Sequence, residues 1–269
     1  MNEWTQILLI GIIVFITHAL EGITGFGCTV LALPFVAMLL GIKTTVPVLA
    51  VLAWLLAGYI VIISWKQIVW KEYFFIVLYV GLGLPFGMLL FRYLPEEGLK
   101  GLLSLLMIGV GINGILKTRK RSLPELSILE TQTNLQTTTN KNTFMRTILF
   151  MGGVIHGAFV SGGPFVVIYA SKALPDKSLF RVSLCLLWFT LNTVWIIQFT
   201  LFDQLSWTPE MGRTLLTTLP FLAVGILTGN YLHRLVNEYY FRLIVYATLF
   251  VSGLILLFSV LKIYSLITL

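Results

Sequence analysis

The sequence predicts an all-α integral membrane protein with two inverted repeats of four hydrophobic elements, each repeat starting with a broken-helix hairpin. Hydrophobic residues make up 58% of the 269-residue chain and charged residues only 11%. An ordinary soluble domain carries roughly 25% charged residues. Apolar runs of about 20 residues, long enough to cross a bilayer, occur along most of the chain. Landmark residues also recur at a nearly constant spacing, which indicates a repeat.

Long apolar runs between turn-forming residues predict six helices that each cross the membrane. They cover residues 44–64, 72–92, 98–117, 178–201, 212–232 and 238–262. The N-terminal apolar stretch has no basic region before it and no small-residue cleavage site, so we expect it to be a retained helix and not a signal peptide.

Two further apolar stretches are interrupted by small residues and predict a helix, a break and a second helix that returns to the same side. Residues 5–41 contain Gly22, Gly25 and Gly27, and residues 144–174 contain the sequence Ser161-Gly162-Gly163-Pro164. The second arm of the later hairpin has 11 residues, from Pro164 to Leu174. At 1.5 Å per residue it reaches only about 16 Å, or half a bilayer. The longer second arm of the first hairpin leaves open whether that hairpin is re-entrant or nearly spanning.

A polar connector divides the chain into a first membrane repeat at 1–117, the connector at 118–143 and a second membrane repeat at 144–269. Equivalent landmarks follow in the same order in both halves, at offsets between 134 and 138 residues. The pairs are His18 and His156, Trp54 and Trp188, Leu84-Pro85-Phe86 and Leu219-Pro220-Phe221, Gly87 and Gly225, and Tyr93 and Tyr231. This constant spacing favours an internal duplication.

The distribution of basic residues predicts the orientation of the chain. With the connector inside, 13 of the 18 Lys and Arg residues lie on the cytoplasmic side, as the positive-inside rule expects. The five left outside are Lys43, Arg92, Lys100, Arg213 and Lys262. Both termini then lie outside a plasma membrane, and three crossings per half invert the second repeat. Because topology explains the net charge of +7, we expect no nucleic-acid partner.

Inverted repeats with a broken helix in each half are a recurring plan of secondary transporters, which bind substrate near the midplane where the breaks meet. Unpaired N–H groups at the start of the half-helix after each break favour an anion. The predicted substrate-binding residues are Thr24, Gly25, Phe26, Gly27, Ser161, Gly162, Gly163 and Pro164. The glycines allow close backbone approach and the hydroxyls donate hydrogen bonds. Close packing of helices through small residues is the alternative interpretation.

Four polar residues are candidates for coupling or for lining a cavity: His18, Glu21, His156 and Asn192. Ionisable groups inside a membrane are costly, which suggests function. Proton coupling fits the two histidines, and so does a neutral histidine that is hydrogen-bonded between helices. Glu21 fits a pair with His18, a role in coupling or an interfacial position. Asn192 either lines the cavity or bonds helices together.

The stretches GITGFGCTVLALP at 22–34 and HGAFVSGGPFVV at 156–167 resemble the glycine-rich motifs of the TauE/SafE family of membrane transporters. The resemblance covers nearly the whole chain and implies export of sulfite or of small organosulfur anions such as sulfonates. Gly25 and Gly27 match the first motif, and Gly162, Gly163 and Pro164 match the second. Many relatives have a longer glycine run, which Phe26 and Cys28 interrupt here, so the resemblance bears more on the fold than on the substrate.

We therefore expect a secondary transporter of a small anion, sulfite or an organic sulfonate, that works by alternating access and is not an enzyme. An anion channel is the nearest alternative, and a lipid or signalling receptor is another. An intramembrane enzyme is disfavoured because the sequence has no H-E-x-x-H motif, no P-loop and no evident Ser/His/Asp arrangement. Neither cysteine has metal-ligand spacing, so we expect no metal and no cofactor. The partners expected are the anion and the bilayer, and a homodimer is left open.

Topology is tested by single cysteines in a background that lacks Cys28 and Cys185. A cysteine at Thr138, beside the connector, and one at Asn2 should react with an impermeant thiol reagent from opposite sides of the membrane. Labelling of both from one side contradicts the inverted arrangement.

Overall fold

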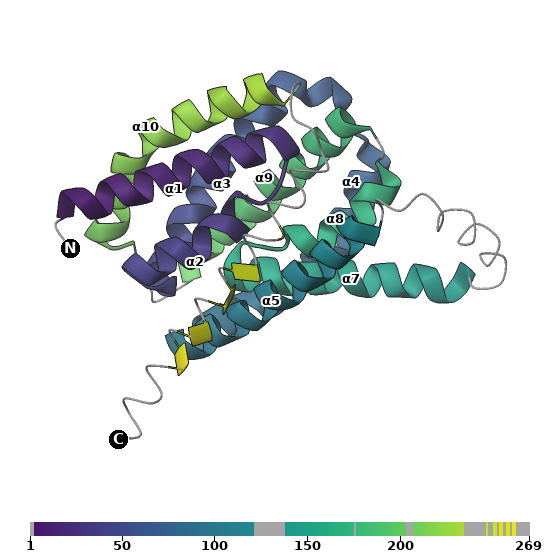
Figure 1. Ribbon diagram of the computed structural model, residues 1–269. Coiled ribbons are helices and arrows are strands. Elements are labelled where there is room, and N and C mark those ends of the chain that lie inside the picture. Colours follow the sequence, from purple (N-terminus) through teal and green to yellow (C-terminus); the bar gives the residue numbers. More distant parts are fainter. Residues whose placement is uncertain are drawn as a thin grey trace.

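The computed structural model describes residues 3–120, 138–174, 176–202 and 207–233, and scattered positions between 246 and 261, and the regular structure in them is helical. The elements, in order, are α1 (Glu3–Thr24), α2 (Cys28–Leu40), α3 (Ile42–Ser64), η1 (Trp65–Gln67), α4 (Trp70–Tyr93), α5 (Glu96–Lys120), α7 (Thr138–Phe159), α8 (Gly163–Ala173), α9 (Lys177–Phe202) and α10 (Pro209–Leu232) (Figure 1). The predicted all-α fold class is confirmed.

Among the described residues, six helices are long and apolar enough to cross a membrane, namely α1, α3, α4, α5, α9 and α10. The last five begin and end within three residues of predicted crossings. The predicted crossing at 238–262 lies largely outside the described residues. The chain is thus a multi-pass membrane protein, and α1, predicted as the first arm of a hairpin, is long enough to cross by itself.

Most of the predicted connector, residues 121–137, lies outside the described residues. α7 already begins at Thr138, ahead of the apolar run. The helix thus extends into polar residues, where hydropathy gives no boundary signal.

Both hairpins have the predicted form of two helices joined by a break. The Nε2 of Gln6, near the start of α1, donates to the carbonyl of Leu39, near the end of α2, at 3.2 Å, so the ends of the first hairpin lie together. In the second hairpin, α8 has 11 residues, the length predicted for its second arm. In each hairpin the break therefore lies at the far end of the first helix, after Thr24 in α1 and after Phe159 in α7.

Two helix pairs pack through glycines. On α10, a Cβ at Gly229 would lie 2.4 Å from the carbonyl oxygen of Ala19 on α1, and Figure 1 shows these helices side by side. On α4, a Cβ at Gly83 would lie 2.1 Å from the carbonyl oxygen of Phe150 on α7, and Gly87 approaches α7 equally closely. Small residues let backbones in a membrane approach in this way. The pairs α1–α10 and α4–α7 are thereby formed.

Helices α3 and α9 pack against each other in the middle of the protein. Trp54 on α3 donates from Nε1 to the hydroxyl of Thr193 on α9 at 2.8 Å, and its ring stacks on Phe189 at 5.1 Å. Leu49, Leu52 and Leu56 on α3 are fully buried. The two central helices therefore join the first and second halves of the chain.

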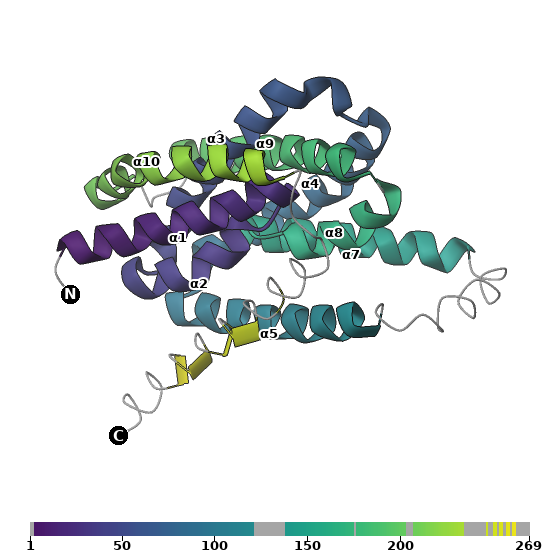
Figure 2. The same cartoon turned by 45° about the horizontal axis from the view of Figure 1, so that its top comes forward.

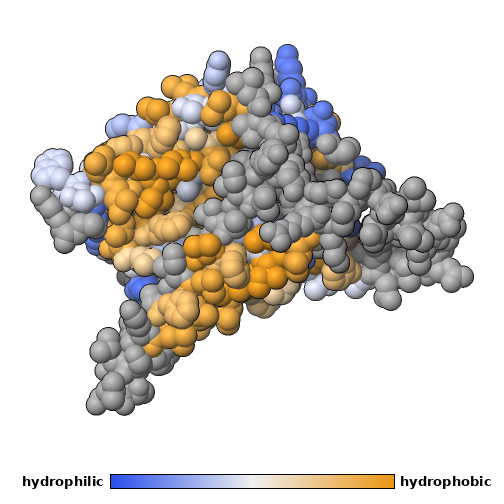
Figure 3. Space-filling model, viewed as in Figure 1, coloured by the Kyte–Doolittle hydropathy of each residue, from blue (hydrophilic) through white to orange (hydrophobic). Residues whose placement is uncertain are grey.

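The outer faces of the helices carry large apolar side chains, as a lipid environment requires. Ile62, Leu105 and Leu227 are each at least 63% exposed. Figure 3 shows apolar surface spread over one face of the molecule. In Figure 2, α5 lies as a layer of its own, and its Gly111 packs closely against Phe250 in the C-terminal segment.

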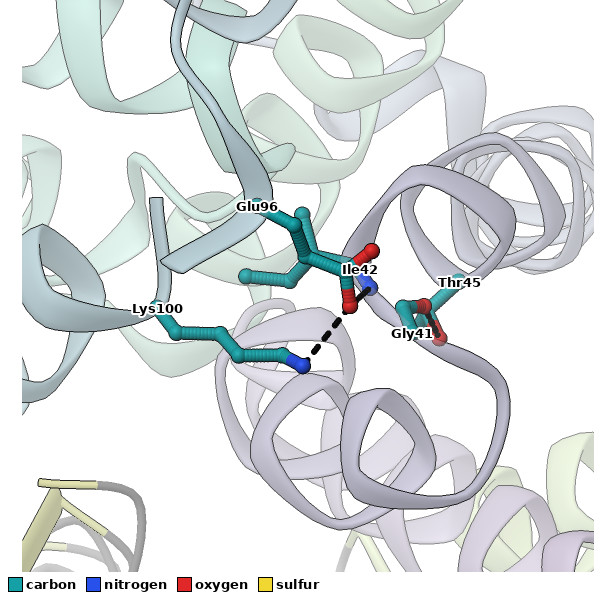
Figure 4. Close-up of polar contacts among 5 residues, drawn as sticks. All are labelled: Gly41, Ile42, Thr45, Glu96 and Lys100. Carbon is teal, nitrogen blue, oxygen red and sulfur yellow. Dashed lines mark hydrogen bonds and ion pairs between the residues drawn. The ribbon is translucent and has the colours of Figure 1, made fainter. Parts of the chain in front are cut away.

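A polar cluster ties three helices together at one end of the bundle, and Figure 4 shows its part between α3 and α5. Glu96, in the first turn of α5, accepts from the backbone N–H of Ile42 at 3.2 Å and pairs with Lys100 at 2.7 Å. The ammonium group of Lys43 donates to the carbonyl of Phe91 near the end of α4. Lys43 and Lys100, which were predicted on the same side of the membrane, therefore lie at the same end of the bundle.

Gly83 and Gly81 offer a matched test of the α4–α7 contact. Gly83→Ala should lower the thermal unfolding midpoint in detergent, because overpacking a tight contact costs about 1–3 kcal/mol or more. Gly81→Ala should leave the midpoint unchanged or raise it, since a Cβ there meets nothing within 4 Å and Ala favours a helix by about 1 kcal/mol. Equal midpoints for the two variants would contradict the close packing.

Candidate functional site

The first break separates α1 from α2 and is set by glycine conformation. Gly25 and Gly27 adopt φ angles of 82° and 107°, in the left-handed region that side chains with a Cβ disfavour. A Cβ on Gly25 would also lie 2.7 Å from the Cα of Arg181 on α9. The carbonyl of Gly25 accepts from the indole Nε1 of Trp188 at 2.9 Å. The break is thus fixed on the backbone and on a side chain of α9.

The second break separates α7 from α8 and contains a strained residue. Val160 has a φ of 53°, which for a β-branched residue is an outlier of the kind that clusters at functional sites and costs about 1–3 kcal/mol. Its N–H donates to the carbonyl of His156 at 2.7 Å. A Cβ on Gly162 would lie 2.4 Å from the carbonyl oxygen of Gly152, so this glycine is needed for packing on α7.

The two breaks meet. A Cβ on Gly163, at the start of α8, would lie 3.4 Å from the ring of Phe26 in the first break. Between them lies a cavity of about 20 Å³. It is lined by Glu21, Gly27, Thr29, Val30, Ala53, His156, Val160, Ser161, Gly163, Trp188 and Asn192. A water molecule needs about 10–15 Å³ in this measure, so the cavity has room for about one.

A polar cluster from α7 and α9 forms one wall of the cavity. His156 and Asn192 are 2% and 1% exposed, and Nε2 of the histidine lies 2.9 Å from the amide oxygen. Because that oxygen only accepts, Nε2 carries the proton. Among the described residues, Nδ1 of His156 and Nδ2 of Asn192 have no hydrogen-bond partner. Trp188 stacks on His156 at 5.3 Å and connects this wall to the first break. The cavity therefore has buried polar atoms available to a ligand.

Glu21 brings a carboxylate to the start of α2. It is 3% exposed, and its Oε2 accepts from the backbone N–H of Cys28 at 2.7 Å. Cys28 is the first residue of α2, so the carboxylate satisfies one of the N–H groups that a helix start leaves without an intrahelical partner. The hydrogen bond joins the two arms of the hairpin across the break.

The two predicted hydroxyl donors are bonded to backbone. Thr24 Oγ1 lies 2.9 Å from the carbonyl oxygens of both Leu20 and Phe26, and Thr24 does not line the cavity. Ser161 lines the cavity, yet its hydroxyl donates to the carbonyl of Phe159 at 2.9 Å. Each hydroxyl proton is thus directed at backbone, and only Ser161 Oγ is placed to face a ligand.

The other predicted residues lie around the site. Phe26 and Pro164 line, with Gly27, a smaller cavity of about 10 Å³. His18 is fully buried with its Nδ1 on the carbonyl of Val14 at 2.9 Å, and does not line the main cavity. Gly25 and Gly162 do not line the main cavity, and they pack against the backbone of Arg181 and Gly152, respectively.

The sequence did not predict that Val160, Val30, Ala53 and Thr29 line the cavity. Residues of these types are common in membrane helices, so nothing in the sequence distinguishes them from their neighbours. Trp188 was recognised as a landmark of the duplication and as a neighbour of the cavity candidate Asn192 on the same helix, but not as a contact of the first break.

Comparison with known families decides which class of protein this site belongs to. The sulfite exporter TauE/SafE family model matches residues 9–256. The chain belongs to this family. The resemblance seen in the glycine-rich stretches is thereby confirmed, and membership in TauE/SafE assigns the chain to a family of membrane exporters of sulfite. No curated protein and no solved structure matches the chain significantly.

Two glycines of this TauE/SafE site should respond differently to alanine. Gly25→Ala should lower the thermal unfolding midpoint in detergent, because the added Cβ would meet the α9 backbone at a left-handed φ. Gly163→Ala should unfold near the wild-type temperature, since its Cβ would make an ordinary contact with Phe26. A loss of stability in Gly163→Ala equal to that in Gly25→Ala would show that both are packing positions.

Proposed function

We propose that this TauE/SafE protein is a secondary transporter of a small anion, sulfite or an organic sulfonate, that binds it between the two helix breaks. The observation that carries the proposal is the convergence of the starts of α2 and α8 on one buried cavity. Gly27, Thr29 and Val30 line it from the first hairpin, and Ser161 and Gly163 line it from the second. Helix starts present N–H groups and a partial positive charge, which stabilise an anion.

The α7–α9 wall supplies side chains suited to a compact oxyanion. Asn192 lines the cavity, and its Nδ2 group, which has no partner among the described residues, is an unused hydrogen-bond donor. We assign substrate contact to the backbone at Gly27 and Gly163 and to Asn192, and also to Ser161, whose hydroxyl proton turns from the carbonyl of Phe159 to the anion. Phe26 and Pro164 form apolar walls, and Gly25, Gly162 and Thr24 hold the breaks. His156 and Glu21 are the coupling candidates inside the cavity, whereas His18 acts from outside it.

Movement is part of the proposal because the cavity is too small for the substrate. Sulfite has four heavy atoms, and about 20 Å³ holds roughly one water. Substrate entry thus requires the walls to separate, first on one side of the membrane and then on the other, as alternating access describes.

The duplication that underlies the proposed inverted repeat is supported by the pattern of helix pairs. α1 and α7 open their respective halves, and α4 and α10 carry the equivalent Leu-Pro-Phe landmarks. α1 packs on α10, and α4 packs on α7. If α1 corresponds to α7 and α4 corresponds to α10, then the pair α1–α10 is equivalent to the pair α7–α4. Duplicated units are expected to pack in such equivalent pairs. We include in the proposal a plasma-membrane location with the connector in the cytoplasm and both termini outside.

The proposal is tested by flux and binding with purified protein. Proteoliposomes should take up labelled sulfite with saturation, and sulfonates should compete better than an uncharged analogue of similar size. Preloading the vesicles with unlabelled sulfite should accelerate uptake, since a carrier exchanges substrate, whereas a channel should show no such acceleration. Catalytic conversion without flux, or a preference for cations, would contradict the proposal.

Asn192→Leu and Gln198→Leu provide a matched pair on α9. Asn192→Leu should weaken methanesulfonate binding roughly tenfold or more, because it removes a buried donor whose loss costs about 1–3 kcal/mol. Gln198→Leu should bind as wild type, since Gln198 does not line the cavity. Isothermal titration of variants with wild-type unfolding midpoints makes the comparison, and equal affinities would remove Asn192 from the site.

A further inference from the structure

We propose that Glu21 is an internal anion that occupies the start of α2 when the site is empty, so that each substrate anion binds together with one proton. This inference rests on the proposed anion site and adds its coupling. It identifies a bound proton as a second ligand of the cavity and Glu21 as the residue that holds it.

The contact that carries the inference is the hydrogen bond from the N–H of Cys28 to Oε2 of Glu21, at 2.7 Å. The N–H group is one of the donors that a helix start offers to an anion. Glu21 is 3% exposed and lines the main cavity. Its carboxylate thus lies in the place where, on the proposed function, the charged group of the substrate has to bind.

A second observation shows that the cavity is built for a ligand beyond Glu21. His156 and Asn192 are at least 98% buried and line the same cavity. Nδ1 of the histidine and Nδ2 of the amide have no partner among the described residues. Polar atoms that are buried without partners are costly, and a bound oxyanion would satisfy the amide.

Two negative charges in this cavity would repel each other, at a large cost in free energy. Like charges in one buried site disfavour each other, and one group responds by taking a proton. The balance is that the Glu21 carboxylate, one proton and a monoanion become the Glu21 carboxylic acid and the bound anion. The proton binds a carboxylate oxygen, and the N–H of Cys28 passes to the anion. The net charge inside the cavity is minus one in both states, on Glu21 before binding and on the anion after it, so the helix starts face the same charge in each state.

Several titratable groups lie on Glu21's own helix and on the elements around it. The test must distinguish proton uptake by Glu21 from proton uptake by these groups. They are His18, one turn before Glu21 on α1, the thiols of Cys28 on α2 and Cys185 on α9, Arg181 on α9 with Tyr59 of α3 beside it, His156 on α7, and His233 on α10, whose ring contacts the carbonyl of Ile23. Among these, His156 shares the cavity and is of the residue type that titrates near neutral pH. A protonated His156 would also favour an anion, so it is the competing explanation.

The test measures methanesulfonate binding to the full-length chain in detergent by isothermal titration between about pH 6 and 8. Methanesulfonate stays ionised throughout, so any proton taken up is bound by the protein. Wild type should lose affinity tenfold for each unit rise in pH wherever Glu21 is ionised in the empty site, by proton linkage. Titrations in buffers of different ionisation enthalpy should count one proton taken up per anion.

Variants assign that proton to a residue. Glu21→Gln, a neutral replacement for the protonated acid, should bind with no proton uptake and no pH dependence. His156→Gln should still take up one proton per anion, although its affinity can differ. Glu210→Gln removes an exposed carboxylate in the first turn of α10 and should behave as wild type.

Each result decides the matter. Proton uptake retained in Glu21→Gln would overturn the inference, in favour of His156 if uptake is lost in His156→Gln and in favour of another group such as His18 if it is not. Binding without proton uptake in wild type would overturn it while leaving the proposed anion site intact, and no anion binding at any pH would contradict both. If Glu21→Gln fails to fold, wild type, His156→Gln and His18→Gln still decide, because loss of uptake in either histidine variant contradicts the role of Glu21.

Discussion

A helix broken inside a bilayer has to satisfy its exposed backbone groups within the protein, because hydrocarbon offers no hydrogen bonds. The first break meets this constraint with the indole of Trp188 on the carbonyl of Gly25 and with the carboxylate of Glu21 on the N–H of Cys28. At the second break, the N–H of Val160 and the hydroxyl of Ser161 bond to carbonyls near the end of α7. Glu21, Trp188 and Ser161 are therefore positioned by hydrogen bonds to the backbone of the breaks, whereas His156 and Asn192 bond to each other.

Helix α9 connects the two breaks. Its residue Arg181 lies against Gly25 of the first hairpin, and Asn192 bonds to His156 of the second. Trp188, between them on the same helix, contacts both hairpins. A shift of α9 would consequently change the geometry of both helix starts together. The glycine-packed pairs α1–α10 and α4–α7 are natural candidates for the units that move, since close backbone contact holds each pair together.

The sequence was sufficient for the elements of the fold but not for the contacts of the site. Hydropathy located five crossings to within three residues, and the glycines marked both breaks, because length and conformational freedom are local properties. The hydrogen bond from Trp188 to Gly25 joins residues 163 positions apart, and no local pattern predicts it. The left-handed conformation of Val160 was also unpredictable, because a valine there has no reason to adopt it except the surrounding packing. The backbone contacts of Thr24 with Leu20 and Phe26, and of Gly25 with Arg181, were not predicted either, and the role of both residues in binding stays a prediction.

The central claim is that the anion binds between the two breaks. The most direct measurement is a crystal structure of the protein with bromomethanesulfonate, whose bromine can be located by its anomalous scattering. An anomalous peak is expected beside the cavity, with the sulfonate within hydrogen-bond distance of the start of α2 or α8 and of Asn192. A sulfonate bound with full occupancy elsewhere, with the cavity still closed around Glu21 and His156, would contradict it.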